Sequence, residues 1–194
     1  MIVIKPNRDE MTAAASVAAN VRLDAVFLTS IQAVNQLGKG VSHAGLDMSA
    51  MVSYRYLGHR ILDQRSLVVE IEGRLELKRK TVESQDQSAP EVTIVVAYGA
   101  SYSLPKPPIP PHIDERAFAS FAKINGPYNC WPYLRQQIQS IAASMDFLFV
   151  LPTLRIEVPR ETALETDAKP SGVLPKAKAA KTKNSRKGTR KSKK

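Results

Sequence analysis

The sequence predicts an α+β fold in which four β-strands precede the helices along the chain. Residues 21–104 show the apolar and polar alternation of strands, whereas residues 114–145 carry apolar side chains at intervals of three and four, which is typical of helices. Runs of strands followed by runs of helices are the order expected of an α+β domain. A chain of 194 residues is long enough for one domain with its own core and short for two.

The first two predicted strands cover residues 21–34 and 51–57. The connection between them contains Gly38, Gly40 and Gly45, which favour turns and irregular structure. Because a connection of this length need not be a tight hairpin, it can cross over one edge of the sheet.

The third predicted strand, residues 67–78, has the clearest pattern, because apolar side chains alternate strictly with charged ones. Such alternation is typical of an antiparallel strand with one face in water. The fourth strand, residues 92–102, is apolar on both faces, so we expect it to be central or covered on both sides. The polar residues 80–90 between them predict a hairpin with a long tip.

Two helices are predicted after a proline-rich spacer. The first begins with Asp114 as its N-cap and ends near Gly126, because Gly126-Pro127 should break a helix. The second begins with Asn129 as N-cap, has Pro132 in its first turn and runs to residue 145. Its apolar side chains form one seam with spacings of three and four, made of Trp131, Leu134, Ile138, Ile141 and Met145.

The chain is expected to divide into three parts. Residues 1–20 are an N-terminal extension, residues 21–158 are the folded domain, and residues 159–194 are a basic tail. Near the end of the domain, residues 147–151 are so apolar that another part of the protein should cover them.

The positive charge is concentrated in the tail. Of the 28 Lys and Arg residues, eleven lie between Lys169 and Lys194, which contains no Asp or Glu, so the first 168 residues hold 17 basic and 18 acidic groups. The tail cannot bury enough apolar surface to fold and is expected to be disordered. It is either an electrostatic arm for RNA, DNA or acidic protein, or a solubilising terminus.

No pattern of catalytic chemistry is found in the sequence. His43, His59 and His112 are not spaced as metal ligands, and the motifs of nucleophile elbows, phosphate loops and dinucleotide sites are absent. The single cysteine, Cys130, lies in the first turn of the predicted second helix, where a dipole would lower a thiol pKa, but a small buried side chain is the simpler interpretation. We therefore expect no enzyme, no metal and no cofactor.

The sequence predicts a cytoplasmic protein without membrane insertion. No segment approaches the roughly 18 apolar residues that cross a bilayer, and residues 11–19 follow two acidic residues, which makes a poor secretory signal. One cysteine excludes an intramolecular disulfide and is compatible with a reducing compartment.

The residues from Tyr128 to Arg135, with Leu151-Pro152 downstream, resemble the SecB family of protein-export chaperones. Members of that family carry a signature in which a Tyr precedes Pro-Tyr-x-Arg, followed by a loop ending in Leu-x-Pro. The match is specific over about thirty residues and looser over residues 21–158. The family's second long helix is not visible in residues 157–168, where Pro159 lies near the start and no apolar seam follows.

The resemblance implies a four-stranded antiparallel sheet with its helices packed on one face. It also implies a homotetramer, a dimer of dimers in which the long helices are sandwiched between sheets. We therefore expect the seam of the second helix, Trp131, Leu134, Ile138, Ile141 and Met145, to form the interface between copies.

The function implied is that of an ATP-independent holdase, which binds unfolded or precursor polypeptides without catalytic residues. Apolar side chains in and beside the crossover are the candidate client-binding residues, with two tyrosines of the next strand: Val34, Leu37, Val41, Leu46, Met48, Met51, Tyr54 and Tyr56. The alternative from another class is an RNA- or ribosome-associated protein that binds through the basic tail.

Two client roles remain open for the holdase. The first is delivery of precursors to the SecA motor, which in the export chaperones docks on acidic residues of the sheet; the candidates here are Glu70, Glu72 and Glu76, although their strand ends in the basic residues 78–80. The second is stabilisation of a specific client such as an antitoxin.

Overall fold

The computed structural model describes residues 1–37, 46–63, 65–80, 89–104 and 113–159. They belong to one compact unit, Met1–Arg160. Its elements are β1 (Ile2–Ile4), α1 (Arg8–Ala18), β2 (Arg22–Asn35), β3 (Met48–Leu62), β4 (Ser66–Arg79), β5 (Val92–Ser103), α2 (Glu115–Ser144) and β6 (Leu154–Ile156).

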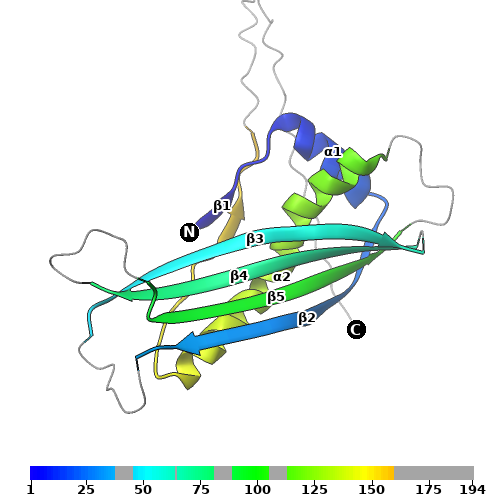
Figure 1. The fold of residues 1–194 in the computed structure, drawn as a ribbon. Coiled ribbons are helices and arrows are strands. Elements are labelled where there is room, and N and C mark those ends of the chain that lie inside the picture. Colours follow the sequence, from blue (N-terminus) through cyan, green and yellow to red (C-terminus); the bar gives the residue numbers. More distant parts are fainter. Residues whose placement is uncertain (38–45, 64, 81–88, 105–112, 160–194) are drawn as a thin grey trace, which may run out of the picture. The chain divides into compact units, whose positions relative to one another are not determined.

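Four long strands form an antiparallel sheet in the order β2-β5-β4-β3, as Figure 1 shows. This confirms the four predicted strands and the central position of β5. β4 and β5 pair directly, as the predicted hairpin requires. Although β2 and β3 are consecutive in the sequence, they occupy opposite edges, so the chain crosses the full width of the sheet between them.

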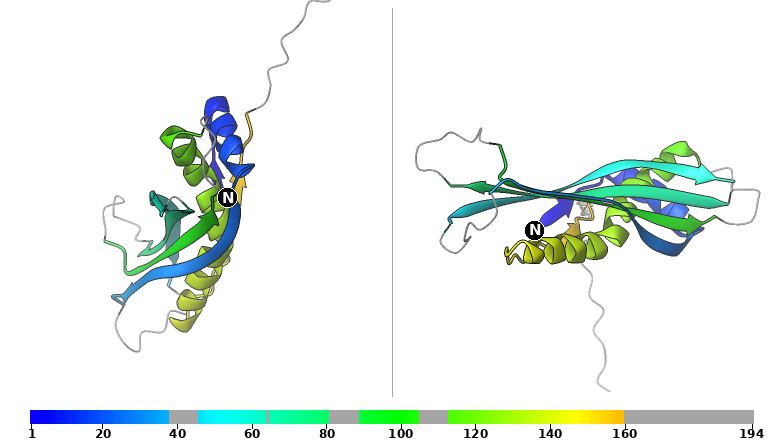
Figure 2. Two further views of the ribbon diagram at one scale, coloured as in Figure 1. Left: turned by 90° about the vertical axis from the view of Figure 1, so that its right-hand side faces the viewer. Right: turned by 60° about the horizontal axis from the view of Figure 1, so that its bottom comes forward.

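The core lies between the sheet and the helices, which pack on one face (Figure 2). We call this the helix-bearing face and the other the open face, because no described helix covers it. On the helix-bearing face the apolar side chains of the two central strands are fully buried: Leu67, Val69, Ile71, Leu75, Leu77, Val92, Ile94 and Val96. The alternation predicted for β4 is confirmed, because its charged side chains lie on the open face.

The two predicted helices are one continuous helix, α2, of 30 residues with Pro127 and Pro132 inside it. The predicted break at Gly126-Pro127 is therefore wrong. A Cβ at Gly126 would lie 2.6 Å from Val69 Cγ1, so this glycine lets the helix approach the sheet closely. In the right-hand view of Figure 2 the green first half and the yellow second half of α2 point in different directions, as expected of a helix with internal prolines.

Burial against the sheet explains why the helix continues through these prolines. Each internal proline costs a helix about 3 kcal/mol, but the helix buries a long apolar side that includes Phe118, Phe121 and Leu134. The predicted cap Asp114 is confirmed, since its Oδ1 accepts a hydrogen bond from the Ala117 amide at 2.8 Å. Asn129 is not a cap and lies in the middle of α2.

The seam assigned to an interface between copies covers the chain's own sheet. Trp131, Leu134 and Ile138 are buried in the core of the monomer, and a Cβ at Gly73 of β4 would lie 3.1 Å from Leu134 Cδ2 and from Ile138 Cδ1. These three side chains are therefore unavailable for contacts between copies. Ile141 and Met145 are half-buried and pack against the same core.

Residues 1–20 contribute two elements that the sequence analysis did not identify. Asn7 caps α1 with Glu10 in a capping box, in which each side chain bonds the other's backbone amide, at 2.8 and 2.9 Å. Val17 is fully buried, and α1 packs against α2. β1 pairs in parallel with β6, so the two ends of the described chain lie side by side.

Candidate functional site: an open edge strand and an aromatic pocket

β2 is an edge strand that is exposed along its whole length except at the half-buried Val26. Its free edge pairs with no described strand. Large apolar side chains project from it at exposed fractions of 39–45%: Leu23, Phe27, Leu28, Ile31 and Val34. An open, apolar strand edge can pair with another extended chain.

Charged side chains distinguish the other edge of the sheet. β3 also exposes apolar residues, but Arg55 in its middle and Arg60 near its end form ion pairs with β4. Between Ala25 and Asn35, β2 carries no charged residue. Because charges are a common protection of edge strands against pairing, β2 is the less protected edge.

The register of β2 divides its apolar side chains between the two faces. Leu23 lies opposite Tyr102, Leu28 opposite Tyr98 and Ile31 opposite Val96, which places them on the helix-bearing face. Phe27 and Val34 lie on the open face. The Phe27 ring covers Gly99 of β5, where a Cβ would lie 2.5 Å from Phe27 Cζ.

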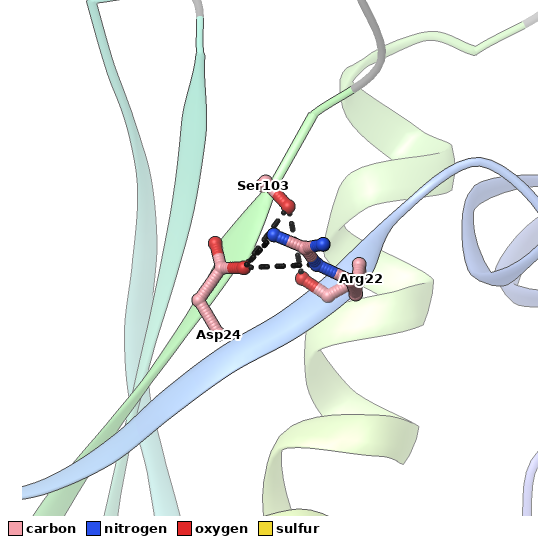
Figure 3. A network of polar contacts seen from close by, with 3 residues as sticks. All are labelled: Arg22, Asp24 and Ser103. Carbon is pink, nitrogen blue, oxygen red and sulfur yellow. Dashed lines mark hydrogen bonds and ion pairs between the residues drawn. The ribbon is translucent and has the colours of Figure 1, made fainter.

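A polar network fixes the start of β2 at a β-bulge (Figure 3). Asp24 is the extra residue of the bulge, and its Oδ1 accepts hydrogen bonds from Arg22 Nε at 3.3 Å, Arg22 Nη2 at 3.2 Å and Ser103 Oγ at 3.1 Å. The bulge pairs Leu23 with Tyr102 and so turns the Leu23 side chain to the helix-bearing face. Asp24 also satisfies the charge of Arg22.

Beside Leu23 lies a pocket of about 510 Å³ between β2, α2 and β6, which we call the aromatic pocket. Its lining is Leu23, Tyr128, Asn129, Trp131, Pro132, Tyr133, Arg135, Thr153 and Leu154. Tyr128 and Tyr133 are 58% and 45% exposed, so their rings are available to a ligand. The residues that carry the sequence resemblance, Tyr128, Pro132, Tyr133 and Arg135, thus meet at one site.

Hydrogen bonds hold the walls of the aromatic pocket in place. Trp131 Nε1 donates to the Pro152 carbonyl at 3.1 Å, which attaches the segment before β6 to α2. Asn129 Nδ2 donates to the Tyr102 hydroxyl at 2.8 Å and attaches α2 to β5. The rings of Tyr98 and Tyr133 have centroids 5.9 Å apart. The pocket is therefore largely preformed.

Arg135 is the one charged residue that lines this pocket. Within the part of the chain that the structure describes, it has no ion pair and no hydrogen bond, and its Nε atom is buried without a partner. The arginines at positions 22, 55, 60, 74 and 79 all have carboxylate partners. The Nε–H of Arg135 is thus a buried donor without an acceptor, which costs free energy.

Burial keeps the groups behind the pocket neutral. It raises the pKa of Tyr102 to about 12, against the opposing hydrogen bond from Asn129 and with a smaller raising effect from Cys130. Burial also raises the pKa of the Cys130 thiol to about 12. Cys130 lies in the middle of α2 and not in a first turn, so no helix dipole lowers its pKa. The interpretation of Cys130 as a small buried side chain is confirmed, and the buried thiol is a poor nucleophile.

The structure does not bring the predicted client-binding residues together in one site. Val34 and Met51 lie on the open face in one cross-strand row, but at opposite edges, with Thr93 and Glu76 between them.

The remaining members of that set have different environments. Leu37 is buried, and Leu46 and Met48 are half-buried against the core. Tyr54 and Tyr56 line a separate pocket of about 290 Å³ with β1 and α2. Val41 lies outside the described residues.

The three acidic residues proposed for docking each have an arginine partner on the open face. Glu70 pairs with Arg60 at 3.3 Å, Glu72 with Arg55 at 3.1 Å, and Glu76 with Arg74 at 2.7 Å. Acidic and basic side chains therefore alternate in pairs across this face.

Residues 147–151 are only half covered. Phe147 and Leu151 are buried, as expected, but Leu148 and Val150 are 89% and 85% exposed. Gln139 of α2 donates to the Phe149 carbonyl at 2.8 Å and holds the segment along the helix. The outward side chains of this segment form a second exposed apolar feature.

Among solved structures, the chain is similar to a SecB-like chaperone of Mycobacterium tuberculosis, solved in complex with a ChAD peptide from the HigA1 antitoxin. The TM-score is 0.61 at 15% identity, covering 75% of this chain and 99% of that one. A protein of unknown function from Streptococcus agalactiae has a TM-score of 0.30 at 9% identity, covering 69% and 97%. No family model matches the sequence, and no curated protein matches it.

The first of these similarities shows that the chain has a SecB-like fold. This confirms the α+β architecture that the resemblance implied, with a four-stranded antiparallel sheet and helices on one face. In the described ranges no helix combines the length and apolar character needed to span a bilayer.

Proposed function

We propose that this protein is an ATP-independent holdase that captures unfolded polypeptide along β2 and in the aromatic pocket. The observation that carries the proposal is the row of exposed apolar side chains on a strand edge that carries no charge between Ala25 and Asn35. Such an edge supplies main-chain hydrogen bonds to any extended segment, while side chains on both faces provide apolar contacts. The binding therefore needs neither a cofactor nor a catalytic group.

The SecB-like fold supports this proposal, because the similar mycobacterial protein is a chaperone seen with an antitoxin peptide. For the client of the present protein, a specific polypeptide such as an antitoxin is favoured over delivery to SecA. The reason is that Glu70, Glu72 and Glu76 each have an arginine partner, so among the described residues these three carboxylates do not form an unpaired acidic patch on the open face. We propose that the protein binds such clients in the cytoplasm.

We further propose that the holdase is a homotetramer, a dimer of dimers. Its contacts would use the exposed Leu148 and Val150 beside the half-buried Ile141 and Met145, since the rest of the seam is occupied by the sheet. Light scattering at micromolar concentration measures the mass. A monomer would contradict the assembly without affecting the capture proposal.

Suppression of the aggregation of a chemically unfolded model protein tests the capture proposal. Replacing Leu28 and Ile31 by Ser should leave the fold intact, because both side chains are 45% exposed, and should strongly reduce suppression. The matched control is Met51→Ser, which removes a side chain that is 55% exposed at the opposite edge. If the folded double variant suppressed aggregation as well as the wild type, and Met51→Ser did not, the result would contradict capture along β2 and indicate β3 instead.

A further inference from the structure

We propose that Arg135 selects client segments in which an acidic side chain lies two residues from an apolar anchor. The proposal rests on the holdase function above and adds the chemistry of the client. The occupant is an internal, extended segment of the client, with its apolar side chain in the aromatic pocket and its carboxylate on the Arg135 guanidinium.

The charge of Arg135 indicates what the ligand must supply. Since the described residues provide it with no carboxylate or carbonyl partner and its Nε–H is a buried donor without an acceptor, a ligand carboxylate that accepts this hydrogen bond removes an existing cost. A guanidinium and a carboxylate match in planar, two-bond geometry, and such a charge-assisted pair is stronger than a neutral hydrogen bond. The ligand should therefore be acidic at this point.

The lining of the pocket indicates the anchor. Apart from Arg135, its walls are formed mostly by rings and aliphatic side chains, with Tyr128 and Tyr133 exposed at the rim. A volume of about 510 Å³ is ample for one aromatic or large aliphatic side chain. Apolar contact thus gives affinity, and the guanidinium adds selectivity.

The spacing follows from the position of Leu23. This residue belongs both to the pocket and to the free edge of β2, so a client strand paired with that edge passes the pocket. Alternate side chains of a strand point to the same face. An anchor and a carboxylate that both reach the helix-bearing face are then an even number of residues apart, two for the nearest pair, and an adjacent acidic residue would point to the open face.

Three synthetic peptides test the spacing and the charge, all acetylated and amidated so that no terminal charge remains. The first is Thr-Glu-Thr-Phe-Thr-Glu-Thr, which is symmetric about its anchor and so independent of strand direction. The second replaces both Glu by Gln, and the third, Thr-Thr-Glu-Phe-Glu-Thr-Thr, has the same composition as the first with adjacent acids. The fluorescence of Trp131, the single tryptophan of the chain, reports binding at the pocket.

The first peptide should bind about tenfold or more tightly than either of the others, as expected for a hydrogen-bonded charge pair. In Arg135→Gln this preference should disappear, and Arg135→Lys should retain part of it. Arg55→Gln, which removes one positive charge from β3, is the matched control and should keep the full preference. Circular dichroism and the melting temperature check that each variant is folded.

Equal binding of the three peptides by the wild-type protein would overturn the proposal without any variant. The proposal would also be overturned if the Gln peptide bound tightly once it carried a free C-terminal carboxylate while the first peptide showed no advantage, because the pocket would then bind chain ends. A change in oligomer mass in Arg135→Gln, with peptide preference unchanged, would assign the carboxylate to a second copy and also overturn it. If aggregation is still suppressed in any of these cases, the holdase proposal stands.

Discussion

Replacing Ile138 by Ala tests whether the apolar seam of α2 belongs to the monomer core. The Ile138 side chain is fully buried, and its Cδ1 is 3.1 Å from the position that a Cβ of Gly73 would occupy. The change removes three carbon atoms from the contact between α2 and the sheet. Because such a site collapses only partly, we expect a loss of about 3–4 kcal/mol in the free energy of unfolding, within the range for large-to-small core changes.

Urea denaturation followed by circular dichroism measures this loss, at two protein concentrations that differ by a factor of about one hundred. A core residue predicts the same loss at both concentrations and no change in the mass measured by light scattering. Ser140→Ala, an exposed change two residues along the same helix, should alter stability by less than about 0.5 kcal/mol. A loss below about 1 kcal/mol together with a reduced mass would refute the reasoning and return Ile138 to an interface between copies.

Three further predictions follow from the packing and charge of the chain. Gly126→Ala should destabilise the protein by about 1–3 kcal/mol in urea denaturation, because the stiff Val69 side chain 2.6 Å from the new Cβ outweighs the better helix propensity; a gain in stability would contradict the close packing. The free energy of unfolding should fall as the pH rises above about 9, because the Cys130 thiol loses its proton there in the unfolded chain, while burial keeps it protonated up to about 12 in the folded chain. Urea denaturation at several pH values should show a dependence on pH that is shallower by about 1.4 kcal/mol per pH unit in Cys130→Ala than in the wild type. Equal pH dependence in the two proteins would refute this prediction. Deleting residues 161–194 should flatten the salt dependence of any nucleic-acid binding and leave both the melting temperature and aggregation suppression unchanged; loss of suppression would favour the alternative that the basic tail carries the function.

The strands could be predicted because their signal is local. In β4, Val69, Ile71 and Leu75 alternate with charged residues, and this pattern by itself indicates a strand with one buried face. The structure shows that buried face. The central position of β5 followed from its two apolar faces. The opposite positions of β2 and β3 could be anticipated only as a crossover, since pairing order depends on contacts far apart in the sequence.

The error in α2 shows where local rules fail. Gly126, Pro127 and Asn129 are all typical of helix boundaries, and in a short peptide they would end a helix. Here the close approach of Gly126 to Val69 and the buried side chains on either side stabilise a continuous helix. Sequence patterns alone do not give the free energy of that packing. The capping box of Asn7 and Glu10, in contrast, was a local signal for α1 that the sequence analysis missed.

The aromatic pocket could be predicted only in part. The resemblance drew attention to the segment from Tyr128 to Arg135, which forms one wall of the pocket. However, the pocket also needs Leu23, which is more than a hundred residues away in the sequence and reaches the site because β2 pairs with β5 and starts with a bulge. The absence of a described partner for Arg135 is likewise a property of the folded chain.

Hydrogen–deuterium exchange with and without an unfolded model client is the most direct test of the proposed capture along β2. If a client strand pairs with the free edge, the backbone amides of β2 that point away from β5 should become protected in the complex, together with the residues around Tyr128 and Tyr133. Amides of β3 should exchange at unchanged rates. Protection confined to β3, or the absence of any new protection in β2 when the client is bound, would contradict the account.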